Sequence, residues 1–397
     1  MLLFFYLCTS EKPMMNHKKI LSFLNLKIFV YVLIAATALF ALVFTYFHNA
    51  KSDGYILGDW LINYQDGGFK RRGLSGSFFF LLQDISGLKL NLLVYFFQVI
   101  VIAGFFYFYF KLIQYKEATF LYLSLLLSSI GFVGLFNCVD YVGKKEFIVF
   151  FLFAYFVYHL NKNSLSKSKE YMICIGLFIA MFFHEITLFF IPYFLIALYL
   201  KTEKIELKRY LKYIFAVFVP AIFIFLLGKN INEGQSLQIL QERGVTLTRG
   251  IFFWDIDERE YIIEHFKEYR LYFISFLISL FHIGFYLKYQ THRKAISILL
   301  IGAFLFSLPL FYLAIDWGRW MYIHMIFLIV LFAIQLKDST DSTSSEVLKL
   351  NLKFCITLFI IILSLTYRVE MSGRGFTFEG FFYRIFVVPI ELLHKMV

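Results

Sequence analysis

The sequence predicts an all-α, polytopic membrane protein, and three observations support that class. The chain has 397 residues, of which 60% are hydrophobic and only 16% are charged, and its mean hydropathy is +0.73. About ten apolar stretches approach the roughly 20 residues that a helix needs to cross a bilayer. Basic residues gather in every second loop between these stretches, as they do in cytoplasmic loops. We therefore expect residues 1–397 to form one transmembrane domain of about 11 helices, within a range of roughly 10 to 12.

The charge of the loops places the first helices. The basic lead-in before residue 28 puts the N-terminus in the cytoplasm, so the loops over 48–89 and 137–146 are expected outside. A short amphipathic helix is expected within the first of these loops, over residues 74–84. The expected membrane helices are residues 28–47, 90–110, 118–136 and 147–160.

The apolar stretch 171–200 decides the topology of everything after it. Lysines flank it on both sides, so both of its ends are expected in the cytoplasm. We predict two short helices that meet at His184 and Glu185. Each would be about 14 residues and about 21 Å long, shorter than the hydrocarbon core of about 30 Å, so the turn would be recessed within the protein. The alternative is one tilted helix with these residues inside it, which would invert the rest of the chain.

The second half continues the alternation. Outside loops are expected over 228–270, 316–320 and 368–397, and a Ser/Thr-rich cytoplasmic linker over 337–346. The apolar segment 381–393 is short, and both a span and an interfacial helix are open for it. The expected membrane helices are residues 213–227, 271–287, 295–315, 321–336 and 350–367.

Charged residues on the outside face form four compact clusters. Ionisable residues are costly near a bilayer and mark functional sites in polytopic proteins. We expect them in exposed loops, where a single charge contributes little to stability. The clusters are Asp59 with Arg71 and Arg72; Asp140 with Lys144, Lys145 and Glu146; His184 with Glu185; and Asp316 with Arg319.

Two of the clusters place basic residues outside, against the usual charge rule. In GGFKRRGLSG, glycines allow a close backbone approach, and the paired guanidinium groups of Arg71 and Arg72 suit a phosphate. These arginines could instead reach to lipid phosphates. Lys144 and Lys145 are candidate substrate-binding residues in the same sense, although simple capping of the next helix also explains that turn.

The other two clusters suggest acid–base chemistry and sugar binding. His184 and Glu185, in a recessed turn, form a candidate base pair, with Asp59 as a further catalytic carboxylate; a satisfied structural histidine is the alternative. In the sequence DWGRW, Trp317 offers a face for a sugar beside Asp316 and Arg319, although tryptophan and an ion pair are ordinary at an interface. Residues 255 and 257 form a DxD pair, a pattern that holds a metal–diphosphate in some sugar transferases, but here it opens a charged helix, where Asp is favoured anyway.

Composition also excludes some partners. The basic loops account for the net charge of +11, and no soluble segment has a basic stripe with interleaved aromatic residues, so we expect no nucleic-acid partner. The four cysteines lack paired spacing, and the single His-Glu pair lacks the second histidine of a zinc motif. We expect no metal and no cofactor.

Taken together, the motifs resemble bacterial polysaccharide polymerases of the Wzy or EpsG type. The resemblance covers most of the chain through dispersed short motifs, with GKKE and KRR where a plainer GRKE and hydrophobic-RR would be usual. It rests on GGFKRRGL at 67–74, the D…KKE turn at 140–146, HE at 184–185 and DWGRW at 316–320.

The resemblance implies a multi-spanning glycosyltransferase of the bacterial inner membrane. Its substrate would be a polyprenyl-diphosphate-linked glycan, joined at the periplasmic face during O-antigen (lipopolysaccharide), capsule or exopolysaccharide synthesis. A chain-length regulator and a flippase would be its partner proteins. In that scheme Glu185 with His184, or Asp59, is the base, and Arg71, Arg72 and Arg319 hold the diphosphate.

Two other classes stay open. A transporter or flippase would place ionisable residues along its helices at mid-membrane, whereas here they cluster at one mouth. A membrane acyltransferase would need a catalytic histidine buried near the middle, a role that His184 could fill. An assay with a lipid-linked sugar separates the three.

Overall fold

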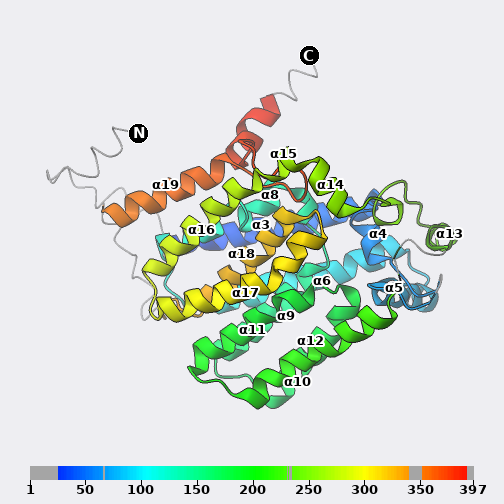
Figure 1. Cartoon of the computed structure of the whole chain (residues 1–397), viewed down its shortest axis with the longest axis horizontal. Helices are drawn as coiled ribbons and strands as arrows, with labels where there is room; N and C mark the ends of the chain where they lie inside the picture. The colour runs from blue at the N-terminus through cyan, green and yellow to red at the C-terminus, as the bar shows by residue number, and fades with distance from the viewer. Residues whose placement is uncertain (1–25, 66–67, 230, 232–234, 339–350, 391–397) are drawn as a thin grey trace.

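The computed structural model describes residues 26–65, 68–229, 231, 235–338 and 351–390, and this part of the chain is helical (Figure 1). Its only extended pairing consists of isolated bridges, such as Lys70 with Lys229, and it contains no β-strand. The all-α prediction is therefore confirmed for the described residues. The basic lead-in, most of the Ser/Thr-rich linker and the end of the 381–393 segment lie outside them.

Within this part of the chain, five helical segments are long and apolar enough to cross a membrane. Their outward side chains are exposed although they are apolar, and Phe225 is 88% exposed. Such a surface suits lipid rather than water, and it indicates a membrane protein. The segments are α3 (Leu26–Ala50), α6 (Leu90–Ile113), α12 (Leu207–Leu227), Phe266–Lys288 and α17 (Arg293–Leu313).

Shorter apolar helices fill the interior and the flanks. At the centre lies α18 (Trp317–Ala333), in which every residue after Trp317 is buried. A helix that is apolar on all sides is stable only when neighbours surround it. Helix α18 packs against α17 and against α9 (Glu146–Asn161), α11 (Thr187–Thr202) and α16 (Tyr272–Lys288). The other helices of this class are α9 (Glu146–Asn161), α11 (Thr187–Thr202) and α19 (Leu352–Thr366). The described residues thus contain fewer membrane-length helices than the predicted 11.

The predicted break in the 171–200 stretch is confirmed. Helix α10 (Lys167–Phe183) ends before His184, and α11 begins at Thr187. Lys201, at the end of α11, donates to the carbonyl of Asn161, while Glu170, at the start of α10, pairs with Arg209. Those contacts join the outer ends of both helices to the same end of the bundle. The chain therefore reverses at His184, and the single-helix alternative is wrong.

The predicted helix over 118–136 is broken into two. Helix α7 (Phe120–Leu126) and α8 (Phe132–Asn137) are separated by a turn in which the N–H of Gly131 donates to Ser128. The Ser128 hydroxyl accepts from the N–H of Ile130, and such local bonds compete with helix continuation. A Cβ on Gly131 would lie 2.5 Å from the carbonyl oxygen of Leu125, so only glycine fits this reversal.

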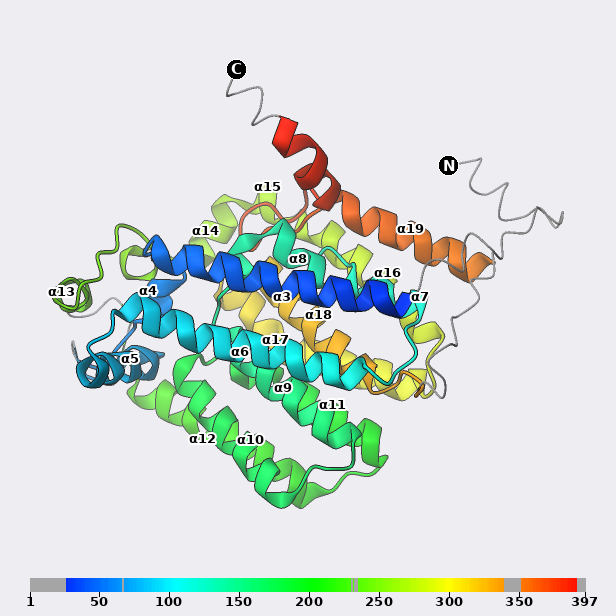
Figure 2. The same cartoon turned by 180° about the vertical axis from the view of Figure 1, so that it is seen from behind.

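Most of the predicted outside segments gather at one end of the bundle. Figures 1 and 2 show α4 (Leu57–Trp60), α5 (Gly73–Ser86) and α13 (Ser236–Glu242) side by side there. The predicted amphipathic helix over 74–84 is thus confirmed as α5.

Asp257 caps α14 (Glu258–Glu264) by accepting from two backbone N–H groups, which supports the capping interpretation of the DxD pair. The remaining elements are η1 (Val139–Tyr141), η2 (Ile251–Phe253), α15 (Phe266–Tyr269), α16 (Tyr272–Lys288) and η3 (Tyr383–Val387).

Candidate active site

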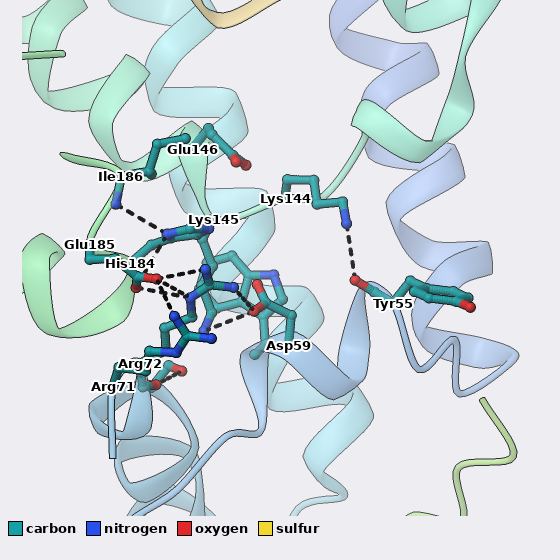
Figure 3. A network of polar contacts seen from close by, with 12 residues as sticks. Tyr55, Asp59, Arg71, Arg72, Lys144, Lys145, Glu146, His184, Glu185 and Ile186 are labelled. Atoms are coloured by element: carbon teal, nitrogen blue, oxygen red, sulfur yellow. Dashed lines mark hydrogen bonds and ion pairs between the residues drawn. The ribbon is translucent and has the colours of Figure 1, made fainter. Parts of the chain in front are cut away.

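The predicted site residues come from five separate segments, and most of them join one buried network of charges (Figure 3). The segments are α4, the turn before α5, the turn before α9, the α10–α11 reversal and the start of α18. Ion pairs form one group around Arg72 and another around Arg319, and contacts of His184 with Arg319 and Glu185 connect the two groups. The members are Asp59, Arg71, Arg72, Lys145, Glu146, His184, Glu185, Asp316 and Arg319.

Arg72 is the first junction of this network. Its Nε and one terminal nitrogen donate to the carboxylate of Glu185 at 2.7–3.0 Å, and the other terminal nitrogen lies 3.4 Å from Asp59. Its backbone is left-handed, with φ of 64°, which costs a non-glycine residue roughly 1–2 kcal/mol. In this strained backbone conformation, the Arg72 side chain contacts the carboxylates of both Glu185 and Asp59. Arg71 is 4.0 Å from Glu185, and half of its side chain is exposed.

Arg319 is the second junction, in the first turn of α18. It donates to Glu146, to Asp316 at 2.9 Å and to Nε2 of His184 at 3.2 Å. The residue is only 6% exposed. The expectation that the arginines are exposed loop charges is therefore wrong for Arg319 and Arg72, because both are inside the protein and paired with carboxylates.

Lys145 and Asp59 form a buried ion pair within the network. The ammonium of Lys145 lies 3.7 Å from Asp59 and 5.9 Å from the centre of the Trp60 ring, and it makes no hydrogen bond. Burial lowers the pKa of Lys145 to about 8, although Asp59 opposes that shift. Burial raises the pKa of Asp59, but Lys145 and Arg72 outweigh it, so the net pKa is lowered. Asp59 is therefore a carboxylate.

His184 is enclosed within the network. Its burial and the neighbouring cations Arg72 and Arg319 lower its pKa well below the ordinary value, so the ring is neutral. Because a guanidinium only donates, Nε2 accepts from Arg319, and the N–H of Ile186 lies 3.3 Å from Nδ1. Both ring nitrogens thus face groups of the protein itself. This environment favours the alternative in which His184 is a structural histidine whose ring nitrogens are both in contact with the protein.

A cavity of about 410 Å³ lies beside the network. Of the predicted site residues, it is lined by Asp59, Arg72, Lys144, Asp316 and Arg319. Lys144 donates to the carbonyl of Tyr55 at 3.1 Å. Arg71, Lys145, His184, Glu185 and Trp317 are outside the lining. The ring of Trp317 packs instead against Tyr269 and Tyr272.

Sequence reasoning missed several residues of the cavity wall. Trp320 lines it in place of Trp317, and a segment of the 228–270 loop adds Arg249, Trp254 and Glu258. This segment is held by a close crossing of Gly54 and Gly250: a Cβ on Gly250 would lie 2.0 Å from the carbonyl carbon of Gly54. Gly250 has φ of 108°, so glycine is required on both counts.

Glu258 is anchored but retains a free oxygen. One carboxylate oxygen accepts from the N–H of Ile315 at 3.0 Å. Burial raises the pKa of Glu258 above its ordinary value, the Ile315 bond opposes the rise, and Asp316 adds to it. Glu258 is therefore a stronger base than Asp59 in the same cavity.

The lining mixes both signs of charge. The carboxylates are Asp53, Asp59, Asp140, Glu258 and Asp316, and the cations are Arg72, Lys144, Arg249 and Arg319. The cavity can therefore face a ligand that carries both hydroxyl groups and a charged group. Carboxylates and tryptophan faces suit hydroxyl-rich sugars, and the cations suit a phosphate. Among the described residues no cluster of three His, Cys, Asp or Glu side chains could hold a metal ion.

Comparison with known proteins finds no matching family model, no matching curated protein and no matching solved structure.

Proposed function

We propose that this chain is a membrane glycosyltransferase that joins polyprenyl-diphosphate-linked oligosaccharide units. The reaction would occur at the periplasmic face of the bacterial inner membrane, in O-antigen, capsule or exopolysaccharide synthesis. One observation carries the proposal: a cavity at one end of an apolar helical bundle combines arginines and a lysine with carboxylates and two tryptophans. A lipid-linked glycan presents a diphosphate and hydroxyl groups together.

The reaction requires two kinds of group, a base and cations, and the cavity supplies candidates for both. A base takes the proton of the acceptor hydroxyl, whose oxygen forms the new bond to C1 of the donor sugar. The bond from C1 to the diphosphate breaks, and the polyprenyl diphosphate leaves with the electron pair. Lys144, Arg249 and Arg319 would stabilise that negative charge, because fixed cations in a partly dry site act without reorganisation.

We assign the base to Glu258 rather than to Glu185. Glu185 pairs with Arg72 and lies outside the cavity lining, and although burial raises its pKa, Arg72 outweighs burial and lowers it to about 2. A carboxylate of such low pKa is a weak base. Asp59, the other sequence-based candidate, lies between Lys145 and Arg72 and would hold these cations in place.

The two rival classes receive less support. A transporter would carry charges along its path, whereas the buried histidines of the bundle interior are in hydrogen bonds with neutral partners: His324 with Tyr193 and Ser307, and His282 with Ser124. An acyltransferase would need His184 to face its substrate, and His184 contacts Arg319 outside the cavity lining.

The exposed cation Arg249 gives the cleanest binding test. Its side chain is 68% exposed, so Arg249→Ala should leave the fold intact while removing one diphosphate contact. We expect inorganic diphosphate to bind purified protein about tenfold more weakly, as loss of one charge-assisted hydrogen bond implies. Calorimetric titration would measure this.

Arg259 provides the matched control for that test. It lies on the same loop, is 57% exposed, and does not line the cavity. Arg259→Ala should bind diphosphate like the parent. Equal affinities for the parent and both variants would contradict diphosphate binding in this cavity, and transfer of a lipid-linked sugar would then have to be abandoned as its function.

The side of the membrane can be tested with single cysteines. Asp140 and Lys204 are both exposed and lie on loops assigned to opposite sides. Asp140→Cys should react with a membrane-impermeant maleimide in intact cells, and Lys204→Cys only after permeabilisation, with the parent chain as background. Gly318, in the predicted outside loop 316–320, is not a suitable position for a labelling cysteine, because a Cβ there would lie 1.8 Å from the Glu370 carbonyl oxygen. The reverse labelling pattern would move the cavity to the cytoplasm.

A further inference from the structure

A second cavity, of about 270 Å³, lies between α16, α17 and α18. Its walls are three helical stripes, whose members recur every three or four residues. On α16 these are Phe276, Ser279, Leu280, Ile283, Gly284 and Leu287. On α17 they are Ser297, Leu300, Ile301 and Phe304, and on α18 they are Met321, His324, Met325 and Leu328. The cavity is therefore a channel along the helices rather than a packing defect at one point.

The lining of this channel is apolar. Its lining residues include no carboxylate, lysine or arginine, and the two ring nitrogens of His324 are bonded to Tyr193, which also lines the cavity, and to Ser307 at 2.8 Å each. A polar ligand would find no free charged partner there. A hydrocarbon chain requires only contact with such walls.

The channel is open towards the side of the bundle. Two of its lining residues, Leu280 on α16 and Ile301 on α17, are 49% and 58% exposed. Both helices belong to the segments that are long and apolar enough to cross a membrane. A chain could therefore enter from the bilayer without passing through water.

Helix α18 connects the channel to the charged cavity. Arg319 and Trp320 line the charged cavity, and Met321 begins the channel one residue later. From Phe276 to Leu287 the α16 stripe extends about 16 Å at 1.5 Å per residue. The same end of α18 thus lines both cavities, with the charged cavity and the apolar channel next to each other along the helix.

We infer that the channel between α16, α17 and α18 holds the proximal isoprenoid chain of a lipid-linked substrate whose diphosphate occupies the charged cavity. The inference rests on the proposed function, because the head-and-tail pairing is what distinguishes this occupant from an ordinary phospholipid chain. Since lipid tails are as apolar as the channel, its role is to orient the substrate rather than to supply most of the affinity.

Two glycines offer a matched test. Gly284 lines the channel and Gly302 does not, yet both are exposed, both lie within membrane-length helices, and a Cβ on either would meet nothing within 4 Å. A phenylalanine at either site can therefore place its Cβ without a close contact, and it has a higher helix propensity than glycine. Only Gly284→Phe should obstruct the channel, and Gly284→Ala should give a smaller effect.

The experiment uses a polyprenyl diphosphate that carries a diazirine near its diphosphate end, with the protein in phosphatidylglycerol nanodiscs. In the parent, we expect crosslinks at Phe276, Phe304 and Met325, mapped by mass spectrometry. Gly284→Phe should reduce them about tenfold, while Gly302→Phe leaves them unchanged. Binding of inorganic diphosphate, measured in parallel, should be the same in all variants.

Each outcome separates the tail site from the proposed function. Crosslinks spread over outer faces, or equal in both phenylalanine variants, would overturn the channel as the tail site while diphosphate binding upheld the function. Channel crosslinks that a diazirine phospholipid reproduces equally would make it a general lipid site and overturn the inference. Channel crosslinks that Gly284→Phe removes, without diphosphate binding, would keep an isoprenoid site but remove the glycosyl-transfer proposal.

Discussion

Replacement of Arg319 by alanine is expected to destabilise the folded protein by about 3–5 kcal/mol, the usual consequence of leaving a buried charge unpaired. The charge left behind is Glu146, which is 4% exposed and pairs with Arg319 from the first turn of α9. The change should appear as a lower apparent melting temperature in detergent and as poor expression. Loss of activity in this variant would therefore say nothing about diphosphate binding.

A second substitution separates the buried charge from other effects of the alanine. Arg319→Ala combined with Glu146→Gln removes both charges and should recover a large part of the lost stability. Arg259→Ala, an exposed arginine outside the network, should melt like the parent. If Arg319→Ala alone melts at the parent temperature, the pair with Glu146 does not form, and the buried network is wrong at its centre.

Much of the site could be predicted because a charged side chain next to an apolar run costs free energy and therefore indicates a function or a partner. The positions of Asp59, Arg72, Glu185 and Arg319 stand out in the sequence for that reason, and the structure brings all four into one network. The pairs that are near in sequence also form, as between Asp316 and Arg319. The pairing of Arg72 with Glu185 could not be predicted, because it depends on how α5 and the α10–α11 turn pack.

The direction of individual side chains escaped prediction. Trp317 and Trp320 lie in the same first turn of α18, and only the packing of α15 and α16 decides that Trp317 is covered and Trp320 faces the cavity. Arg249 and Glu258 belong to a loop whose composition resembles any polar loop. The one local signal was Gly250, whose meaning depends on Gly54, nearly 200 residues away.

The fold was predictable where a pattern had a simple physical cause. Basic flanks on both sides of the 171–200 stretch required a reversal, and the structure reverses at His184. The break between α7 and α8 lacked such a cue, because the turn around Ser128 is made of small residues within an apolar run. The length of α18 gave no hint that it is buried on every side, since apolar composition alone suits lipid and protein interior equally.

Replacement of Glu258 by glutamine is expected to lower kcat about 100- to 10,000-fold, the usual contribution of a general base. The amide keeps the shape of the side chain and the bond from Ile315, so the fold and substrate binding should persist. Polymer formation from lipid-linked units, followed on gels, measures turnover, and inorganic diphosphate titration checks the cavity. Glu260→Gln, on the exposed side of α14, is the matched control and should retain full activity.

The pH profile tests the same assignment independently of the size of the loss. A base must be ionised to take a proton, and the pKa of Glu258 is raised above the ordinary value of 4.5. In the parent, kcat/KM should therefore fall as the pH is lowered through a pKa higher than 4.5. The residual rate of Glu258→Gln should lack that acid limb, whereas a merely structural role would leave the limb in place. Polymerisation by Glu258→Gln at the parental rate would exclude Glu258 and return the role to Asp59, a carboxylate of the cavity whose Oδ2 has no hydrogen-bond partner among the described residues.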